Sequence, residues 1–258
     1  RGGAGRDSGG GAMRHIIPVS GGRDSSALAV WLCKDLALGE MPYELVFTDT
    51  KAELPELYDY LNRLETYLGI TITRISDPRG YEGLLESFNY FFPNQGARWC
   101  TERLKIRPFQ KWLGQDEATV YIAIRADEAE RVDQRYTLSK RRIHRVFPFV
   151  ERDIDKARVE TILKRHGLWD HPMYALKPRS GCWCCFYQSA TSWRKIAQRY
   201  PDLAERALEW ERLHKVQNPG TQTFSYIGQG RSLKNVLAQE EIDFGDIFDK
   251  ACGECRDD

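Results

Sequence analysis

The chain has no apolar run that approaches the ~20 residues needed to cross a bilayer. It also lacks a leader of the secretory kind, in which a charged, an apolar and a small-residue region follow one another. Its 38 lysines and arginines nearly balance its 37 aspartates and glutamates, so the net charge is +1. This balance excludes a protein that coats polyanions with its whole surface, and any nucleic-acid contact needs a local patch. We therefore expect a cytoplasmic protein that does not bind membranes.

The length allows one main domain with a smaller appendage. Residues 1–12 are rich in glycine, and Met13 then begins a segment that reads like a natural start. We interpret residues 1–12 as a tag remnant or a flexible arm. Residues 13–150 are expected to form a nucleotide-binding domain, and residues 151–258 a mostly helical C-terminal region that carries metal-binding cysteines.

Apolar segments alternate with helical periodicities in the first of these regions. Strands are predicted at 15–20, 43–48, 70–75 and 118–124, and helices at 25–38, 55–68 and 101–113. Such alternation predicts a doubly wound α/β fold with a parallel sheet, in which ligands bind beyond the carboxyl ends of the strands. In the second region we expect a helix at 154–166 and one long helix with a packing stripe. The stripe is formed by Ile196, Tyr200, Leu203, Ala207, Trp210 and His214.

A glycine-containing loop follows the first predicted strand and precedes a helix. Its glycines let the backbone amides approach an anion, and the helix N-terminus adds oriented N–H groups. The Asp24 carboxylate is expected to hold a cation such as Mg²⁺ rather than to touch phosphate itself. The loop differs from the Gly-x-x-x-x-Gly-Lys-Ser/Thr loop used for γ-phosphoryl transfer. It consists of Ser20, Gly21, Gly22, Arg23, Asp24, Ser25 and Ser26.

This loop resembles the signature of the PP-loop ATP-pyrophosphatase superfamily, in which lysine is commoner at the position of Arg23. Three further segments resemble motifs of its branch related to phosphoadenosine phosphosulfate (PAPS) reductases: 47–55, 98–108 and 124–128. The segment Gly181-Cys182-Trp183-x-Cys185 resembles an element of the sulfur-transfer subunit of DNA phosphorothioation systems, and of short PAPS-reductase-like proteins of phages and bacteria.

The resemblance implies a set of site residues. ATP would bind with Mg²⁺, its pyrophosphate on residues 20–26, its adenosine beside Asp49, and a cationic group from Arg125 near the phosphates. Asp24, Lys105 and Arg125 are the implied catalytic residues. PAPS and APS reductases as a family have a degenerate phosphate loop, whereas this loop is intact, which favours ATP-dependent adenylation.

Seven cysteines in a protein without an export signal are expected to be reduced, and therefore to act as metal ligands or redox groups. Cys182 and Cys185 have the spacing of two ligands to one metal centre. Cys100 lies in a motif where relatives carry a cluster ligand, and Cys252 or Cys255 would complete the set. Four thiolates suit a [4Fe–4S] cluster or zinc, and the resemblance favours iron and sulfur.

The remaining cysteines and a basic cluster are open to other interpretations. Cys33 is expected to be a small buried residue, and Cys184 is left without a role. Cys255 is alternatively a mobile redox nucleophile. The cluster of Lys140, Arg141, Arg142, His144 and Arg145 is either a nucleic-acid contact or a solvated charged loop.

We therefore predict adenylation of an acceptor by ATP with release of pyrophosphate, followed by transfer of sulfur or nitrogen. A sulfonucleotide reductase and a non-catalytic nucleotide-sensing subunit are the alternatives. The acceptor is a nucleic acid or a small metabolite. A sulfur-donor protein such as a cysteine desulfurase, and a second copy of the chain, are the expected protein partners.

Overall fold

The computed structural model describes residues 13–36, 42–132, 142–220 and 232–238. The chain divides into two compact units, residues 1–185 and 186–258. Each is described by itself. No helix of the described residues has the length and apolar character needed to cross a membrane.

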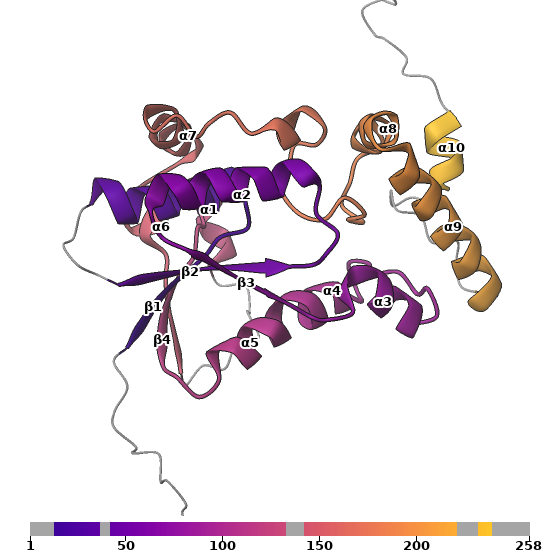
Figure 1. Ribbon diagram of the computed structural model, residues 1–258, viewed down its shortest axis with the longest axis horizontal. Coiled ribbons are helices and arrows are strands. Elements are labelled where there is room, and N and C mark those ends of the chain that lie inside the picture. Colours follow the sequence, from indigo (N-terminus) through magenta and orange to yellow (C-terminus); the bar gives the residue numbers. More distant parts are fainter. Residues whose placement is uncertain (1–12, 37–41, 133–141, 221–231, 239–258) are drawn as a thin grey trace, which may run out of the picture. The chain divides into compact units, whose positions relative to one another are not determined.

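The first unit is built on a parallel sheet whose described strands lie in the order β3-β2-β1-β4-β5 (Figure 1). The strand order reverses at the junction of β1 and β4, because the chain runs outward on one side to β3 and on the other to β5. The predicted doubly wound α/β fold is therefore confirmed. The strands are β1 (Arg14–Pro18), β2 (Tyr43–Asp49), β3 (Ile72–Ser76), β4 (Ala118–Tyr121) and β5 (Ile143–Val146).

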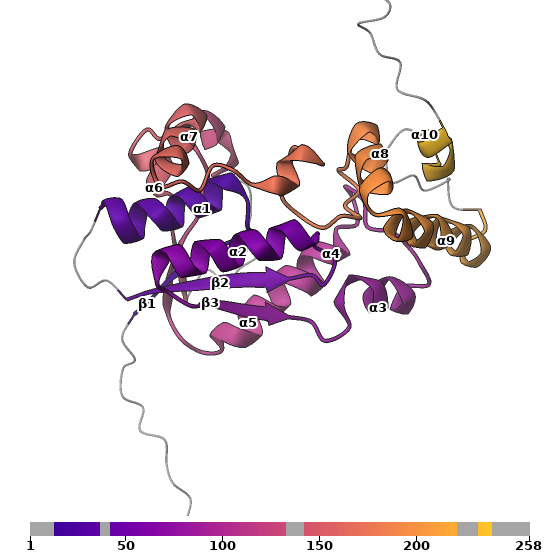
Figure 2. The ribbon, with the colours of Figure 1, turned by 45° about the horizontal axis from the view of Figure 1, so that its top comes forward.

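Helices cover both faces of this sheet. In both views α1 (Arg23–Val30) and α2 (Pro55–Leu68) lie on one face and α5 (Arg107–Leu113) on the other (Figures 1 and 2). Burial on two faces explains why β1 reads as a continuous apolar run rather than an alternating one. On the face of α5, a core cluster joins the helix to β1, β2, β4 and β5: Ile16, Val46, Phe109, Leu113, Ala118, Val120 and Ile143.

The α2 helix follows its predicted pattern closely. Pro55 stands at its first position, where a missing N–H costs nothing. Its leucines at 57, 61, 64 and 68 are all buried against the sheet. Gly69 ends the helix in the left-handed conformation, with φ 69°, and a methyl group there would meet nothing within 4 Å.

Several predicted elements have different bounds in the structure. The predicted helix 25–38 is α1 followed by a π-helical turn, Trp31–Asp35. The predicted helix 101–113 is α4 (Trp99–Thr101), a π-helical turn (Glu102–Ile106) and α5. The strand β5 was not predicted, because charged residues interrupt its apolar pattern and the segment looked like a basic loop. His144 and Arg145 lie in this strand, whereas Lys140 and Arg141 lie outside the described residues.

The remaining helical elements of the first unit lie between β3 and β5 or follow β5 in the chain. They are α3 (Gly80–Ser87), a 3₁₀ turn (Ala126–Arg131), α6 (Pro148–Glu151), α7 (Lys156–Arg165) and a second 3₁₀ turn (Pro172–Ala175). Because α7 packs on α1, the first unit extends past residue 150, the boundary expected from the sequence, and includes Cys182 to Cys185.

The second unit is helical in its described part, with α8 (Ala190–Arg199), α9 (Pro201–Gln217) and α10 (Leu233–Ala238). The prediction of one long helix was wrong, because the chain breaks at Tyr200, whose ψ is 73°. Proline disfavours the helical conformation of the residue before it, and Pro201 then starts the next helix. The Glu211 carboxylate accepts the Leu233 N–H at 2.8 Å and ties α10 to α9.

Candidate functional site

The predicted loop lies at the carboxyl end of β1, beside the point where the strand order reverses. Its own hydroxyl groups hold it together. The Ser20 N–H donates to Ser25 Oγ at 3.1 Å, and Ser25 Oγ donates to the Gly22 carbonyl at 3.1 Å. The Ser20 and Ser25 hydroxyl oxygens lie 3.0 Å apart. These hydroxyls shape the loop, whereas Ser26 is fully buried in the core.

The two glycines of the loop meet neighbours too closely to carry side chains. Gly21 has φ 71°, and a Cβ there would lie 2.9 Å from Leu57 Cγ on α2. A Cβ on Gly22 would lie 2.5 Å from Ser180 Oγ. The loop backbone is therefore clamped between α2 and the segment that leads into the cysteine motif.

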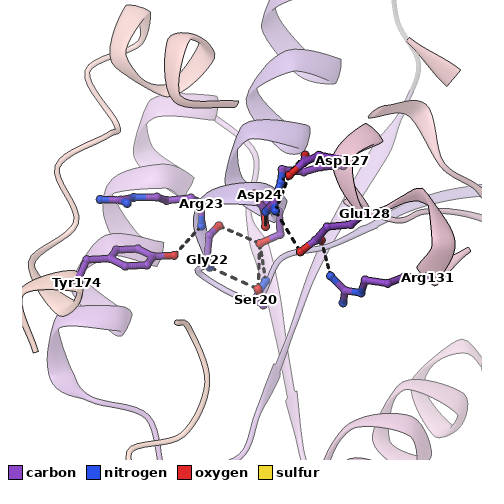
Figure 3. Close-up of polar contacts among 10 residues, drawn as sticks. Ser20, Gly22, Arg23, Asp24, Asp127, Glu128, Arg131 and Tyr174 are labelled. Atoms are coloured by element: carbon purple, nitrogen blue, oxygen red, sulfur yellow. Dashed lines mark hydrogen bonds and ion pairs between the residues drawn. The ribbon is translucent and has the colours of Figure 1, made fainter. Parts of the chain in front are cut away.

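The loop after β4 reaches the phosphate loop through an ion pair. Arg125 Nη1 donates to Asp24 Oδ2 at 2.8 Å, so the structure brings these two predicted site residues together. The same guanidinium bonds both oxygens of Asp127 and pairs with Glu128 at 3.0 Å (Figure 3). Burial raises the pKa of Asp24, and the charge of Arg125 opposes that shift. Arg125 therefore holds the Asp24 carboxylate in place. Each of the three nitrogens of its guanidinium already pairs with a carboxylate.

Arg23 is directed to the other side of the loop (Figure 3). Its guanidinium lies over the rings of Trp169 and Tyr174, 3.7 Å and 4.0 Å from their centroids. Its backbone N–H donates to the Tyr174 hydroxyl at 3.0 Å. The side chain of Arg23 is thus held by cation–π contacts with a segment that follows α7.

A buried histidine supports the loop from the same segment. His171 Nε2 lies 2.9 Å from the Gly21 carbonyl oxygen, and the ring stacks on Tyr60 at 3.9 Å. Burial, more than the nearby charges of Arg63 and Arg23, lowers the pKa of His171 to about 4. The imidazole is therefore neutral at pH 7, and Nε2 is the nitrogen that donates to the carbonyl.

Asp49 stands at the end of β2, on the neighbouring strand. Its Oδ1 accepts the Lys51 N–H at 2.7 Å and the Tyr58 hydroxyl at 2.8 Å. These bonds order the loop between β2 and α2. In that loop the Ala52 carbonyl accepts the Trp183 N–H at 2.8 Å, which anchors the cysteine motif at the same end of the sheet.

Four of the cysteines gather in the first unit. Cys182 hydrogen-bonds with Cys184 and Cys185, and Cys185 raises the pKa of both Cys100 and Cys184. Burial is the main cause that raises the pKa of the Cys100 and Cys184 thiols. The positive charge of Lys105 lowers the pKa of Cys100, so this predicted catalytic lysine lies beside the cysteines.

The thiols have the donor chemistry of a thiolate metal centre, but the described residues alone do not assemble one. In the part of the chain that the structure describes, no group of three or more His, Cys, Asp or Glu side chains is placed to hold a metal ion. Cys252 and Cys255, the predicted further ligands, lie outside the described residues. Cys33 is half-buried, and burial raises its pKa to about 11.

The segment 169–180 supplies the site residues that the sequence did not reveal: Trp169, His171, Tyr174, Lys177 and Ser180. The segment has no strand or helix periodicity, and it contains none of the motifs discussed above. Its position directly before Gly181-Cys182 was the one available signal. Its contacts with the loop arise between residues about 150 positions apart, for example His171 with Gly21.

Residues 14–188 match the phosphoadenosine phosphosulfate reductase domain family, which covers both the loop and the cysteine motif. The chain belongs to this family. The predicted PAPS-reductase-like branch of the PP-loop superfamily is thereby confirmed, and the family places the chain among proteins of sulfur-related, nucleotide-dependent chemistry.

Relatives of this family share modest identity with the chain. An uncharacterised protein of Methanocaldococcus jannaschii is 26% identical over 209 residues, which are 76% of this chain and 40% of that protein. An uncharacterised nin region protein of Escherichia phage lambda is 29% identical over 148 residues, 46% of this chain and 51% of that protein. The chain thus spans about half or less of these relatives' length.

A solved structure of the same family supports the fold. The PAPS reductase from Candida auris, solved as a phosphate complex, aligns with a TM-score of 0.51 at 15% sequence identity. The alignment covers 66% of this chain and 81% of the reductase. At this identity the likeness concerns the fold alone.

The crowding at Gly21 predicts a large loss of stability on substitution. Gly21→Ala combines left-handed strain with a clash against buried Leu57, so we expect a loss of roughly 2–4 kcal/mol in the free energy of unfolding. Gly69→Ala, at an equally positive φ but in open space, is the matched control and is expected to lose about 1 kcal/mol. Urea denaturation measures the free energy of unfolding of both variants. Equal losses would contradict the prediction, because they would show that Leu57 moves aside without an energetic cost.

The neutral state of His171 predicts a pH-dependent stability. Its pKa is about 4 in the folded protein, against an ordinary histidine value of 6.5, so protonation favours the unfolded chain. The contribution is complete above pH 6.5 and is lost as the pH falls towards 4, by roughly 3 kcal/mol. The difference in unfolding free energy between the wild type and His171→Phe is therefore expected to shrink over this range. His144→Phe, on an exposed side chain, is the control, and a difference independent of pH would contradict the assignment.

Proposed function

We propose that this protein cleaves ATP between the α and β phosphates and adenylates an acceptor, which then receives sulfur or nitrogen. The observation that carries the proposal is the intact Ser-Gly-Gly-x-Asp-Ser loop, clamped at the strand-order reversal, with Asp24 held by Arg125 at 2.8 Å. A loop of this kind offers backbone amides and hydroxyls to phosphate, and its carboxylate is a hard oxygen ligand for Mg²⁺.

The reaction has two displacements. An acceptor oxygen attacks the α-phosphorus of ATP, the bond from that phosphorus to the bridging oxygen of the β-phosphate breaks, and pyrophosphate leaves. A sulfur or nitrogen nucleophile then attacks the acceptor carbon, and AMP leaves with the former acceptor oxygen. The protein supplies binding, orientation and charge stabilisation in both steps.

The residues of the site have separate roles in this scheme. The amides of the loop bind the pyrophosphate end, and Asp24 holds Mg²⁺ while Arg125 keeps its carboxylate in place. Asp49 orders the loop beside the adenosine. Lys105, next to Cys100, provides positive charge where the nucleophile approaches the adenylated acceptor.

The cysteines are the proposed sulfur-handling part of the site. Cys100, Cys182 and Cys185, with Cys252 or Cys255, would hold a [4Fe–4S] cluster, or alternatively zinc. A cluster bound there would supply a site for labile sulfur. The acceptor is proposed to be a nucleic acid or a small metabolite, and the sulfur donor a protein such as a cysteine desulfurase.

Product analysis tests the first displacement. With Mg²⁺, ATP and an extract of RNA and small metabolites, we expect AMP and pyrophosphate in equal amounts by phosphorus NMR. Asp24→Asn is expected to lower the rate of AMP formation by about tenfold or more, because the metal loses a charged ligand. Asp59→Asn, at an exposed position of α2, is the matched control and should leave the rate unchanged. ADP with phosphate, or sulfite release from PAPS without ATP cleavage, would contradict the proposal and favour an ATPase or a reductase.

Metal analysis tests the cysteine centre. After anaerobic purification we expect iron and acid-labile sulfide in near-equal amounts, with visible absorption. Cys182→Ser is expected to abolish most of the iron, whereas Cys33→Ser, outside the cluster of cysteines, should retain it. Stoichiometric zinc would replace the iron–sulfur assignment, and a metal-free wild type would remove the centre from the proposed function.

A further inference from the structure

Lys177 is a lysine buried in the interior of the first unit. Its relative exposure is 2%, and it is among the largest fully buried side chains of the described residues. A lysine amine is a donor with no acceptor capacity, and burying its charge is costly unless an opposite charge or several acceptors compensate it. Such a residue calls for a compensating anion.

The contacts of Lys177 do not provide that anion. Its amine donates to the Gly181 carbonyl, an uncharged acceptor. Among the described residues no carboxylate forms an ion pair with it, whereas each of the neighbouring arginines has dedicated partners. Arg125 is held by Asp24, Asp127 and Glu128, and Arg23 lies over two aromatic rings.

The position of Lys177 connects it to the phosphate loop. Ser180 stands against Gly22, close enough that a Cβ there would lie 2.5 Å from its Oγ, and Gly181 follows directly. The charge of Lys177 also acts on His171, which bonds the Gly21 carbonyl; burial is the main cause of the lowered pKa of His171, and Lys177 adds to it. Lys177 is thus linked to Gly22 through Gly181 and Ser180, and its charge reaches the histidine that bonds Gly21.

The partner that Lys177 has in this structure belongs to a glycine with a backbone conformation that other residues rarely adopt. Gly181 has φ 123°, a conformation that side chains rarely allow, and a methyl group there would meet nothing within 4 Å. Because glycine allows the widest range of backbone conformations, we expect the Gly181 peptide to reorient at lower cost than that of another residue. An anion on the loop would then compete with the Gly181 carbonyl for the amine.

We propose that Lys177 is the counter-charge of the phosphate anion bound at the loop of residues 20–26. This inference rests on the proposed function for its choice of ligand, since it names the residue that neutralises the pyrophosphate end of the nucleotide. The arginines at positions 23 and 125 serve instead to hold the loop and Asp24 in place. The class of ligand is a condensed phosphate, free or as part of a nucleotide.

Calorimetric titration with inorganic pyrophosphate and Mg²⁺ tests the inference directly. Three substitutions separate charge from structure: Lys177→Arg keeps the charge, Lys177→Gln keeps a donor for the Gly181 carbonyl but no charge, and Lys177→Met keeps neither. We expect Lys177→Gln and Lys177→Met to weaken pyrophosphate binding at least about tenfold, and Lys177→Arg to retain most of it. Lys111→Met, at an exposed position of α5, controls for the change in net charge.

The possible outcomes decide between a charge role and a structural one. If Lys177→Gln binds pyrophosphate like the wild type, the amine merely holds Gly181 and the inference is wrong. If the wild type does not bind pyrophosphate, the inference is also wrong. The inference and the proposed reaction can fail separately. If both neutral variants lose pyrophosphate binding but the wild type releases no pyrophosphate from ATP, the proposed reaction is overturned and the anion site is supported. If the neutral variants bind pyrophosphate like the wild type and the wild type cleaves ATP to AMP and pyrophosphate, the inference on Lys177 is overturned and the proposed reaction is supported.

A measurement on the unchanged chain covers the case in which the neutral variants do not fold. The Nζ and Cε resonances of Lys177, assigned by their absence from the spectrum of Lys177→Arg, are expected to shift when pyrophosphate is added and not when sodium chloride of equal ionic strength is added. Resonances that stay in place at saturating pyrophosphate would overturn the inference.

Discussion

The ion pair between Asp24 and Arg125 is the contact on which the site depends. It joins the loop after β1 to the loop after β4, across the point where the strand order reverses. Two neighbouring parallel strands whose chain connections run in opposite directions leave a crevice at their carboxyl ends. The pair spans this crevice, and Asp127 and Glu128 add two more carboxylates to the same guanidinium. Their combined charge keeps the guanidinium in place, and with it the Asp24 carboxylate.

The second constraint is the segment between α7 and the cysteine motif. His171 contacts Gly21, and Tyr174 contacts Arg23. Ser180 lies against Gly22, so one stretch of chain follows the turn of the loop. The same stretch continues into Cys182, and Trp183 bonds the loop after β2. The loop of residues 20–26 and the cysteine motif are therefore joined by a short stretch of chain within one compact unit.

Much of the fold follows from local pattern. The leucines of α2 repeat with helical spacing between Pro55 and Gly69, and each of these two residues has a conformational preference that defines a helix end. The β1 run is apolar because helices bury both of its faces. By contrast, β5 carries His144 and Arg145 at the edge of the sheet, where polar side chains remain in solvent, and its pattern resembles a loop. The break at Tyr200 was missed because the apolar stripe continues across it, although Pro201 marked the place.

The sequence by itself determined the fold class and the family, because these depend on residues that are adjacent or regularly spaced. It also singled out Asp24 and Arg125 as candidate site residues, since both lie in motifs at predicted strand ends. The tertiary structure alone decided what each side chain touches. It directed Arg23 to the rings of Trp169 and Tyr174, kept His171 neutral beside Gly21, and buried Lys177 without a carboxylate partner among the described residues. Burial and charge pairing depend on all the neighbours of a side chain. The fold brings these neighbours together from distant positions in the sequence, so no local pattern predicts them.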